Sequence, residues 1–202
     1  MKKNRILKII FVLILLGILG GGYWFYRCYV TDRQKLKDLI IDDTLYAAEI
    51  ETAAKKHGLP PELVRAVIKK ESSFRKDHIG DAGEIGLMQV LPRGAAAEWA
   101  RVNKCAEPTK KELMQVETNL DIGCWYLARC MKKWSDYRHG MELALAEYNA
   151  GGKNSARWKP EKKNDEVIHR IDFPTTRKYV TDIMHDYREY LIEREQNSRR
   201  KN

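Results

Sequence analysis

Apolar residues recur at helical spacing along most of this sequence, and no stretch alternates apolar and polar residues as a half-buried strand does. The clearest case is the segment 61–74, where Val64, Val67 and Ile68 follow the three-and-four spacing that places side chains on one helix face. Pro61 suits the first turn of such a helix. The pattern therefore predicts an all-α, or nearly all-α, fold.

Glycines, prolines and capping residues divide the sequence into further helices. Gly58 ends a helical stretch, and the glycines at 80, 83 and 86 predict a loop that folds back over the end of segment 61–74. Thr109 and Glu112 have the spacing of a capping box. The expected helices cover residues 45–56, 61–74, 95–102, 109–116, 119–134 and 141–149, and a long last helix begins at Pro174 and carries Tyr179, Ile183, Tyr187 and Leu191 on one stripe.

One acid lies on the apolar stripe of segment 61–74. Glu71 continues the spacing of Val67 and Ile68. Removal from bulk water disfavours a charged carboxylate, so the pKa of Glu71 should rise and the group could stay protonated near neutral pH, as a general acid must. The alternative is a helix-terminal glutamate that turns outward or meets a basic partner. The stripe alone leaves both interpretations open.

The N-terminal region has the pattern of a membrane anchor. Residues 9–26 carry no charge, and this run is close to the roughly 20 residues that cross a bilayer as a helix. Four basic residues precede it, and positive flanks stay on the cytoplasmic side. We therefore expect a single-pass transmembrane helix in the cytoplasmic (inner) membrane, with the rest of the chain on the periplasmic or extracytoplasmic side. A cleaved signal peptide is the alternative, because small glycines lie near the end of the run.

The formal net charge of +9 is concentrated at the two ends of the chain. Four basic residues lie in the first eight positions and three at 199–201, which leaves a charge of +2 for the residues between. This distribution favours membrane topology and a solvated tail over a nucleic-acid-binding face. The sequence accordingly divides into a basic end with its anchor at 1–29, a tether at 30–43, one domain at 44–195 and a basic tail at 196–202.

The positions of the cysteines are compatible with one disulfide bond, and those of the histidines do not suggest a metal site. An exported domain could hold one bridge, and we predict Cys105 with Cys124, because Cys124 and Cys130 point in different directions on one helix. Cys130 is expected to face inward as a small apolar residue. The five histidines are scattered without a metal-ligand spacing, so neither a metal site nor a cofactor is expected.

Five short stretches, taken together and in chain order, carry a family resemblance. They are Glu71-Ser-Ser-Phe74, Gly86-Leu-Met-Gln-Val90, Asn119-Leu-Asp-Ile-Gly-Cys-Trp-Tyr-Leu127, Ala146-Glu-Tyr-Asn-Ala-Gly151 and Pro174-Thr-Thr-Arg-Lys-Tyr-Val180. The set, spread over roughly residues 57–187, resembles the signature of the soluble-lytic-transglycosylase (SLT) family, whose catalytic domain is related to goose-type lysozyme. The resemblance implies a mostly helical, lysozyme-like SLT domain.

The resemblance also implies a reaction, cleavage of the β-1,4 bond between N-acetylmuramic acid and N-acetylglucosamine in peptidoglycan. Glu71 would protonate the glycosidic oxygen and then take a proton from the sugar's own 6-hydroxyl, which closes a 1,6-anhydro ring without water. Ordinary glycoside hydrolysis uses two carboxylates, whereas this scheme needs one. A lysozyme-type muramidase and a noncatalytic peptidoglycan-binding scaffold stay open as alternatives. The implied partners are glycan strands and, beyond them, wall-remodelling or secretion machinery.

Four further residues acquire implied roles in substrate binding. Met88 and Gln89 match a pair that lines the sugar site, although a methionine could simply fill the core. Tyr148 matches a tyrosine whose hydroxyl approaches the catalytic carboxylate, with core packing as its alternative. Asn149 matches a neighbour that holds the cleft.

Position 80 departs from the family pattern. Many members have a serine nine residues after the catalytic glutamate, where it can hydrogen-bond the carboxylate, but this chain has Gly80. The departure leaves the restraint on Glu71 unexplained. Five other acids could approach the cleft, and each is expected to be a solvated surface acid: Asp77, Asp81, Glu84, Glu98 and Glu147.

Overall fold

The computed structural model of the chain describes residues 22–23, 27 and 42–201. The chain divides into two compact units, residues 1–42 and 43–202, and the second unit carries helices α2 to α9. The expected transmembrane helix and tether lie almost entirely outside the described residues. Across the described ranges, no helix combines the length and the apolar character that crossing a bilayer requires.

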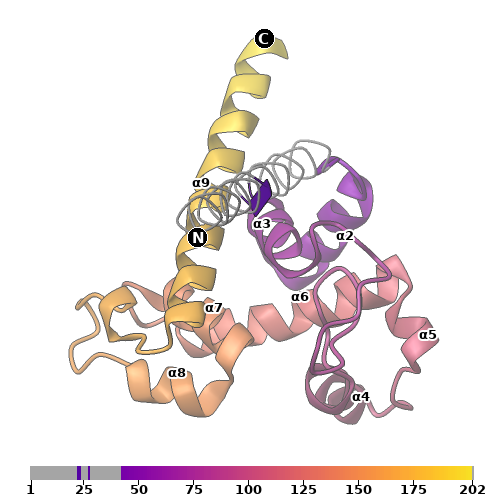
Figure 1. Cartoon of the computed structure of the whole chain (residues 1–202), viewed down its shortest axis with the longest axis horizontal. Coiled ribbons are helices and arrows are strands. Elements are labelled where there is room, and N and C mark those ends of the chain that lie inside the picture. The colour runs from indigo at the N-terminus through magenta and orange to yellow at the C-terminus, as the bar shows by residue number, and fades with distance from the viewer. Residues whose placement is uncertain (1–21, 24–26, 28–41, 202) are drawn as a thin grey trace, which may run out of the picture. The chain divides into compact units, whose positions relative to one another are not determined.

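Helices build nearly all of the second unit (Figure 1). The predicted all-α class is confirmed, since β structure within 42–201 is limited to isolated bridges that join Ile79 to Ile85 and Ile85 to Val90. The helices are α2 (Ala47–His57), α3 (Pro61–Ser72), α4 (Ala97–Asn103), α5 (Lys110–Leu113), α6 (Val116–Lys133), α7 (Gly140–Ala150), α8 (Gly152–Trp158) and α9 (Pro174–Lys201), with short helical turns at Pro92–Ala96 and Ile168–Arg170.

Most helix ends follow the signals in the sequence. Gly58 ends α2 in the left-handed region at a φ of 67°, and Thr109 and Glu112 form the predicted capping box of α5. The expected helix over 141–149 is α7, which ends at Ala150 and is followed by Gly151 with a φ of 82°. The next helix, α8, starts at once at Gly152 and was not predicted. Glycine disfavours a helix in an isolated chain, and here the packing of α8 against α7 outweighs that preference.

Two sets of packed helices form the core. α6 packs against α2 and α7 and buries Leu120 and Leu127 completely. α3 packs against α9, as Figure 1 shows, and α9 also packs against α7. On the predicted stripe of α9, Tyr179 and Ile183 are buried, and the two residues that follow on the stripe are half-buried. The start of α9 therefore lies within the core.

The three cysteines in the described part of the chain are free thiols, so the predicted bridge between Cys105 and Cys124 is wrong. α6 turns Cys124 inward, where its Sγ approaches the Met88 Sδ at 3.7 Å, whereas Cys105 is exposed beyond the end of α4. Cys130 faces inward as predicted. Burial raises the pKa of both inward thiols to about 12, so they behave as apolar core residues.

Candidate active site

Glu71 lies in the last turn of α3, just before the chain leaves the helix. Ser73 and Phe74 both adopt the left-handed conformation, with φ angles of 51° and 61°, and this turns the chain sharply away from the helix axis. The hydroxyl of Tyr179 on α9 donates a hydrogen bond to the Glu71 Oε1 at 2.5 Å. Tyr179 is 5% exposed, so the restraint on the carboxyl comes from the core itself.

The pKa of Glu71 is raised to about 7. Burial is the largest cause, because it penalises the charged form, and the negative charge of Glu84 adds to it. The hydrogen bond from Tyr179 and the positive charge of Lys70 act in the opposite direction. The carboxyl is therefore divided between its protonated and ionised forms near neutral pH, which suits a group that gives up a proton and recovers it. The direction of this shift is the one that the sequence predicts, and the Glu71 residue as a whole is half-buried.

The loop that follows α3 is fastened to both α3 and α6. The Ser72 hydroxyl donates to the Leu87 carbonyl at 2.9 Å. The buried amide of Asn119 on α6 accepts from the Met88 N–H at 2.8 Å and donates to the carbonyls of Ile85 and Leu113 at 2.7 and 2.8 Å. These bonds fix residues 85–88 beside the end of α3, as the predicted fold-back requires.

Gly86 is required where the loop approaches α6. Its φ of 80° lies in the left-handed region, and a Cβ at this position would lie 2.3 Å from the Asn119 Nδ2. Gln89 follows with a φ of 46°, and its Nε2 donates to the carbonyls of His78 at 3.2 Å and Gly86 at 2.9 Å. The loop backbone thus holds the Gln89 side chain in one orientation, with its Oε1 left to accept.

Met88 does not present its side chain to the cleft. The side chain is fully buried against α6, where a Cβ at Gly123 would lie 2.5 Å from the Met88 Sδ. The sugar contact expected from this side chain is therefore replaced by the core-filling role that was its alternative. The Met88 carbonyl has a separate task, since it accepts the Tyr148 hydroxyl at 2.8 Å.

Two tyrosines stand near Glu71, and their roles differ from expectation. The Tyr148 hydroxyl on α7 donates its hydrogen bond to the Met88 carbonyl, while the Tyr179 hydroxyl donates to the Glu71 carboxyl. Burial, followed by the charge of Glu71, raises the pKa of both phenols well above the usual range, so both remain donors. Sequence reasoning missed Tyr179, although it lies in the matched segment 174–180. Asn149 is exposed, and its Oδ1 accepts from the Thr176 hydroxyl at 2.8 Å, which joins α7 to α9.

The other acids have partners or face solvent. Asp77 and Asp81 are exposed, as expected. Glu98 is half-buried and pairs with Arg129. Glu147 is buried, contrary to expectation, because its Oε2 accepts from Lys133 and Trp134 at 2.7 Å each and from Ser155 at 2.9 Å, and these donors offset its desolvation. Glu84, also half-buried, is the acid whose charge acts on Glu71.

A groove of about 400 Å³ adjoins the loop and α7. Its lining includes Gln89, Glu98, Tyr126, Tyr148 and Asn149. The groove therefore gathers three of the predicted substrate-binding residues, two of them from α7 and one from the loop. Its aromatic faces, two amides and a carboxylate provide both apolar and hydrogen-bonding contacts for a sugar-like ligand.

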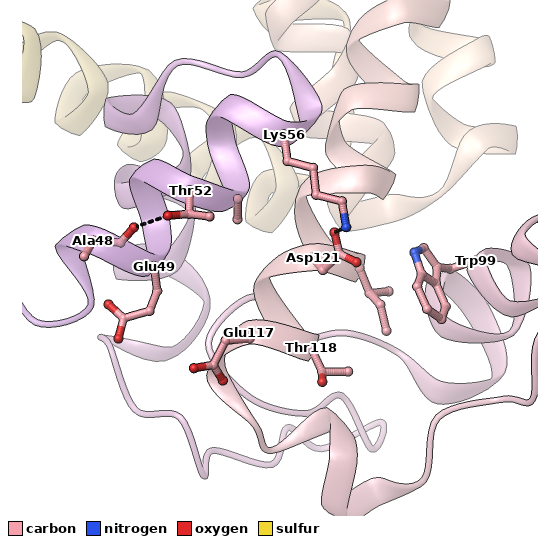
Figure 2. Close-up of a pocket in the computed structure, with 10 residues that line it drawn as sticks. Ala48, Glu49, Thr52, Lys56, Trp99, Glu117, Thr118 and Asp121 are labelled. Atoms are coloured by element: carbon pink, nitrogen blue, oxygen red, sulfur yellow. Dashed lines mark hydrogen bonds and ion pairs between the residues drawn. The ribbon is translucent and has the colours of Figure 1, made fainter.

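A larger hollow of about 590 Å³ lies elsewhere, between α2, α4 and α6. Figure 2 shows Lys56 reaching Asp121 on one side of it and Trp99 on the other, and the Lys56 Nζ lies 2.7 Å from the Asp121 Oδ1. None of the predicted site residues lines this hollow. In the part of the chain that the structure describes, no three His, Cys, Asp or Glu side chains come together as metal ligands would.

A family model and a number of curated relatives match this chain, among them the two that follow. The model of the Transglycosylase SLT domain matches residues 48–171. The membrane-bound lytic murein transglycosylase E of Buchnera aphidicola is 29% identical over 143 residues, which are 69% of this chain and 65% of that protein. The membrane-bound lytic murein transglycosylase C of Histophilus somni is 35% identical over 92 residues, 45% of this chain and 25% of that protein. The chain thus spans less than two thirds of either relative.

Solved structures share the fold, among them the two that follow. An inactive variant of the lytic transglycosylase Slt from Pseudomonas aeruginosa matches with a TM-score of 0.62 and 27% identity over 71% of this chain and 23% of that one. The 70 kDa soluble lytic transglycosylase from Escherichia coli matches with a TM-score of 0.63 and 24% identity over 72% of this chain and 24% of that one. Since the family model spans more than half of the residues, the chain belongs to the Transglycosylase SLT domain family.

Proposed function

We propose that the protein is a lytic transglycosylase that cleaves the β-1,4 bond between N-acetylmuramic acid and N-acetylglucosamine in peptidoglycan and leaves 1,6-anhydromuramic acid ends. The observation that carries this proposal is the Glu71 carboxyl, which is desolvated at the end of α3, bonded to Tyr179 and given a pKa of about 7. The names of the matched relatives, which are lytic murein transglycosylases, support the same substrate.

In the proposed reaction, Glu71 first acts as the acid. Its proton passes to the glycosidic oxygen as the bond between that oxygen and C1 of the muramic acid breaks. The 6-hydroxyl oxygen of the same sugar then bonds to C1, and the Glu71 carboxylate takes the hydroxyl proton. One proton is given and one is recovered, no water is consumed, and Glu71 ends protonated. Tyr179 acts as a positioning residue, because its hydroxyl holds one oxygen of the carboxyl throughout.

The groove beside the loop is proposed to bind the glycan strand. The Gln89 Oε1 would accept a hydrogen bond from an amide or hydroxyl group of the sugar, since the Gln89 Nε2 already donates to two backbone carbonyls. Tyr148 and Asn149 would form the opposite side, with an aromatic face for a sugar ring and an amide for its polar groups. Met88 would contribute indirectly, because its carbonyl accepts the hydrogen bond that holds the Tyr148 hydroxyl in place.

Replacing the acid tests the catalytic assignment. Glu71→Gln keeps the shape of the side chain but has no proton to give, so cleavage of purified sacculi should fall by roughly 100-fold or more while the fold is kept. Glu117→Gln changes an exposed acid that lines the separate hollow and serves as the matched control. Unchanged turnover in Glu71→Gln would overturn the assignment.

Mass analysis of the released fragments decides the class of reaction. Anhydro ends are expected from a transglycosylase, whereas reducing ends would show a lysozyme-type hydrolase. Binding to sacculi without release of fragments would show a noncatalytic scaffold.

We further propose that residues 1–29 anchor the protein in the cytoplasmic membrane, with residues 30–43 as a tether and 44–195 as the catalytic domain outside the cytoplasm. The uncharged run at 9–26 and the membrane-bound relatives support this arrangement. Residues 196–201 of the expected basic tail belong to helix α9, which runs to Lys201. Fractionation should find the full chain with the inner membrane, and deletion of 1–29 should release it; a full chain in the soluble fraction would contradict the anchor.

A further inference from the structure

A third groove, of about 600 Å³, is formed by the turn between α2 and α3, the C-terminal half of α6 and the start of α7. Its lining comes from residues 57–60, from α6 between Trp125 and Lys132, and from the segment that leads to Met141. None of the predicted site residues lines it, and the proposed reaction makes no use of it. We refer to it as the basic groove, because of its charges.

Apolar side chains form much of the surface of the basic groove. Trp125, Met131, Tyr137 and Met141 all line it, and each is half-buried, so part of each side chain faces solvent. The Arg129 guanidinium lies over the Trp125 ring, 4.9 Å from its centroid, and supports the indole from one side. Tryptophan, tyrosine, methionine and arginine are the residue types enriched where proteins bind one another. The composition of the groove therefore favours a polypeptide ligand.

The charge of the basic groove is positive. Arg129, Lys132 and Arg138 line it, and no aspartate or glutamate does. Arg129 is paired with Glu98. Lys132 and Arg138 are exposed, and no acid in the described part of the chain forms an ion pair with either of them. Two positive charges without acidic partners thus border an apolar surface.

The hollow between α2, α4 and α6 has the opposite charge. Glu49, Glu117 and Asp121 line it, together with Lys56. Asp121 also bonds the imidazole of His57 at 2.6 Å, so the histidine that lines the basic groove is already engaged. Since like charges repel, an acidic ligand would be kept out of this hollow and drawn to the basic groove.

We propose that the basic groove is a docking site for an acidic segment of a partner protein that also carries apolar side chains. Carboxylates of the segment would pair with Lys132 and Arg138, and an aromatic or aliphatic side chain would pack against Trp125. An anionic wall polymer could satisfy the two charges, but it lacks the apolar side chains that would cover Met131 and Met141. The site goes beyond the proposed reaction, because it shares no residue with the catalytic groove.

The test begins with peptides selected from a random library on the immobilised full chain. The recovered sequences should be rich in aspartate, glutamate and aromatic residues. A fluorescein-labelled synthetic peptide with a recovered sequence should bind the double variant Lys132→Glu with Arg138→Glu about 10-fold more weakly or worse, because two attractive charges become repulsive. Lys110→Glu with Lys111→Glu is the matched control, since both lysines are exposed and neither lines the basic groove.

A second variant tests the apolar contact separately from the charges. Trp125→Ala keeps Lys132 and Arg138, and it should still weaken binding of the same peptide by about 10-fold. Circular dichroism checks that each variant is folded, and cleavage of purified sacculi by the double variant should stay at the level of the wild type.

Three results would overturn the docking site. The recovered peptides could be neutral or basic, or they could bind the double variant as tightly as the wild type. The third is a double variant that loses binding to purified sacculi and keeps its affinity for the peptide, since this would assign the basic groove to the wall polymer. The proposed function is judged independently of all three, by Glu71→Gln.

Discussion

Glu71 and Tyr179 form the central contact of the site, and they come from helices more than 100 positions apart in the chain. The carboxyl is pulled toward its neutral form by burial and by Glu84, and toward its ionised form by Tyr179 and Lys70. The pKa of Glu71, about 7, results from the balance of these effects. Because the acid must be protonated to start the reaction, we expect cleavage to decline as the pH rises above about 7.

Removing the Tyr179 hydroxyl should shift this balance in a known direction. The hydrogen bond from Tyr179 lowers the pKa of Glu71, so Tyr179→Phe raises it, and the alkaline limb of the pH profile should move to higher pH. The carboxyl also loses its orientation, and kcat should fall by roughly 10-fold or more. Steady-state kinetics from pH 5 to 9 would measure both effects.

Tyr187→Phe is the control on the same helix, since Tyr187 is half-buried and lies two turns beyond Tyr179. The two effects of Tyr179→Phe separate a positioning role from a structural one, because a general loosening of the fold would lower kcat without moving the limb. A limb that moves to lower pH would contradict the assigned direction.

One side chain of α6 makes most of the hydrogen bonds described between the loop over α3 and the helices around it. Asn119 satisfies one N–H and two carbonyls of the buried backbone around residues 85–88 and Leu113. Leaving a buried polar group without its hydrogen-bond partner costs about 1–3 kcal/mol of stability. An apolar side chain at position 119 would therefore leave these backbone groups unsatisfied and destabilise the loop. The arrangement ties the position of Gln89 and Glu84 to the packing of α6.

Asn119→Ala should therefore destabilise the protein by about 3 kcal/mol or more and lower the activity further than the loss of folded protein explains. Urea unfolding measures the first effect, and turnover per folded molecule measures the second. Asn103→Ala is the matched control, because Asn103 is exposed and its amide donates only to the Trp99 carbonyl at 2.8 Å. Equal effects of the two substitutions would contradict the role of Asn119.

The local part of this architecture could be predicted from the sequence. Helix periodicity predicted α3 with Glu71 on its apolar face, and capping signals predicted the end of α2 and the start of α5. Contacts between distant segments escaped that reasoning. The Tyr179 bond, the burial of Glu147 among three donors and the inward turn of Cys124 all depend on how helices pack, which no local spacing encodes.

At the level of the whole chain, the first residue of the second unit, Asp43, is held by side chains from two of the unit's helices. The Arg65 Nη2 lies 2.9 Å from the Asp43 Oδ1, the Arg65 Nε donates to the Asp43 carbonyl at 3.0 Å, and the Tyr190 hydroxyl donates to the Asp43 Oδ2 at 3.0 Å. The start of the unit is thereby joined to α3 and to α9. Because these contacts lie within the unit, we expect the unit to fold without residues 1–42.

A chain that begins at Asp43 should consequently fold and cleave purified sacculi at a rate within about twofold of the full chain, because the acid and its partners all lie within the second unit. Circular dichroism and fragment release measure the two properties. In whole cells the shortened chain should lose activity on the wall, since the proposed anchor is gone. An unfolded product would show that the first unit is part of the domain.

The contact between α3 and α9 has one more property, which follows from its charges. Three ion pairs join basic residues of α3 to acids of α9. They are Arg65 with Glu193 at 3.0 Å, Lys69 with Asp186 at 2.9 Å and Lys70 with Asp182 at 2.5 Å. Pairs this close to solvent add little to stability and are screened by dissolved salt. They nevertheless join the two helices that carry Glu71 and Tyr179 at three points. High ionic strength should therefore weaken catalysis well before it unfolds the protein.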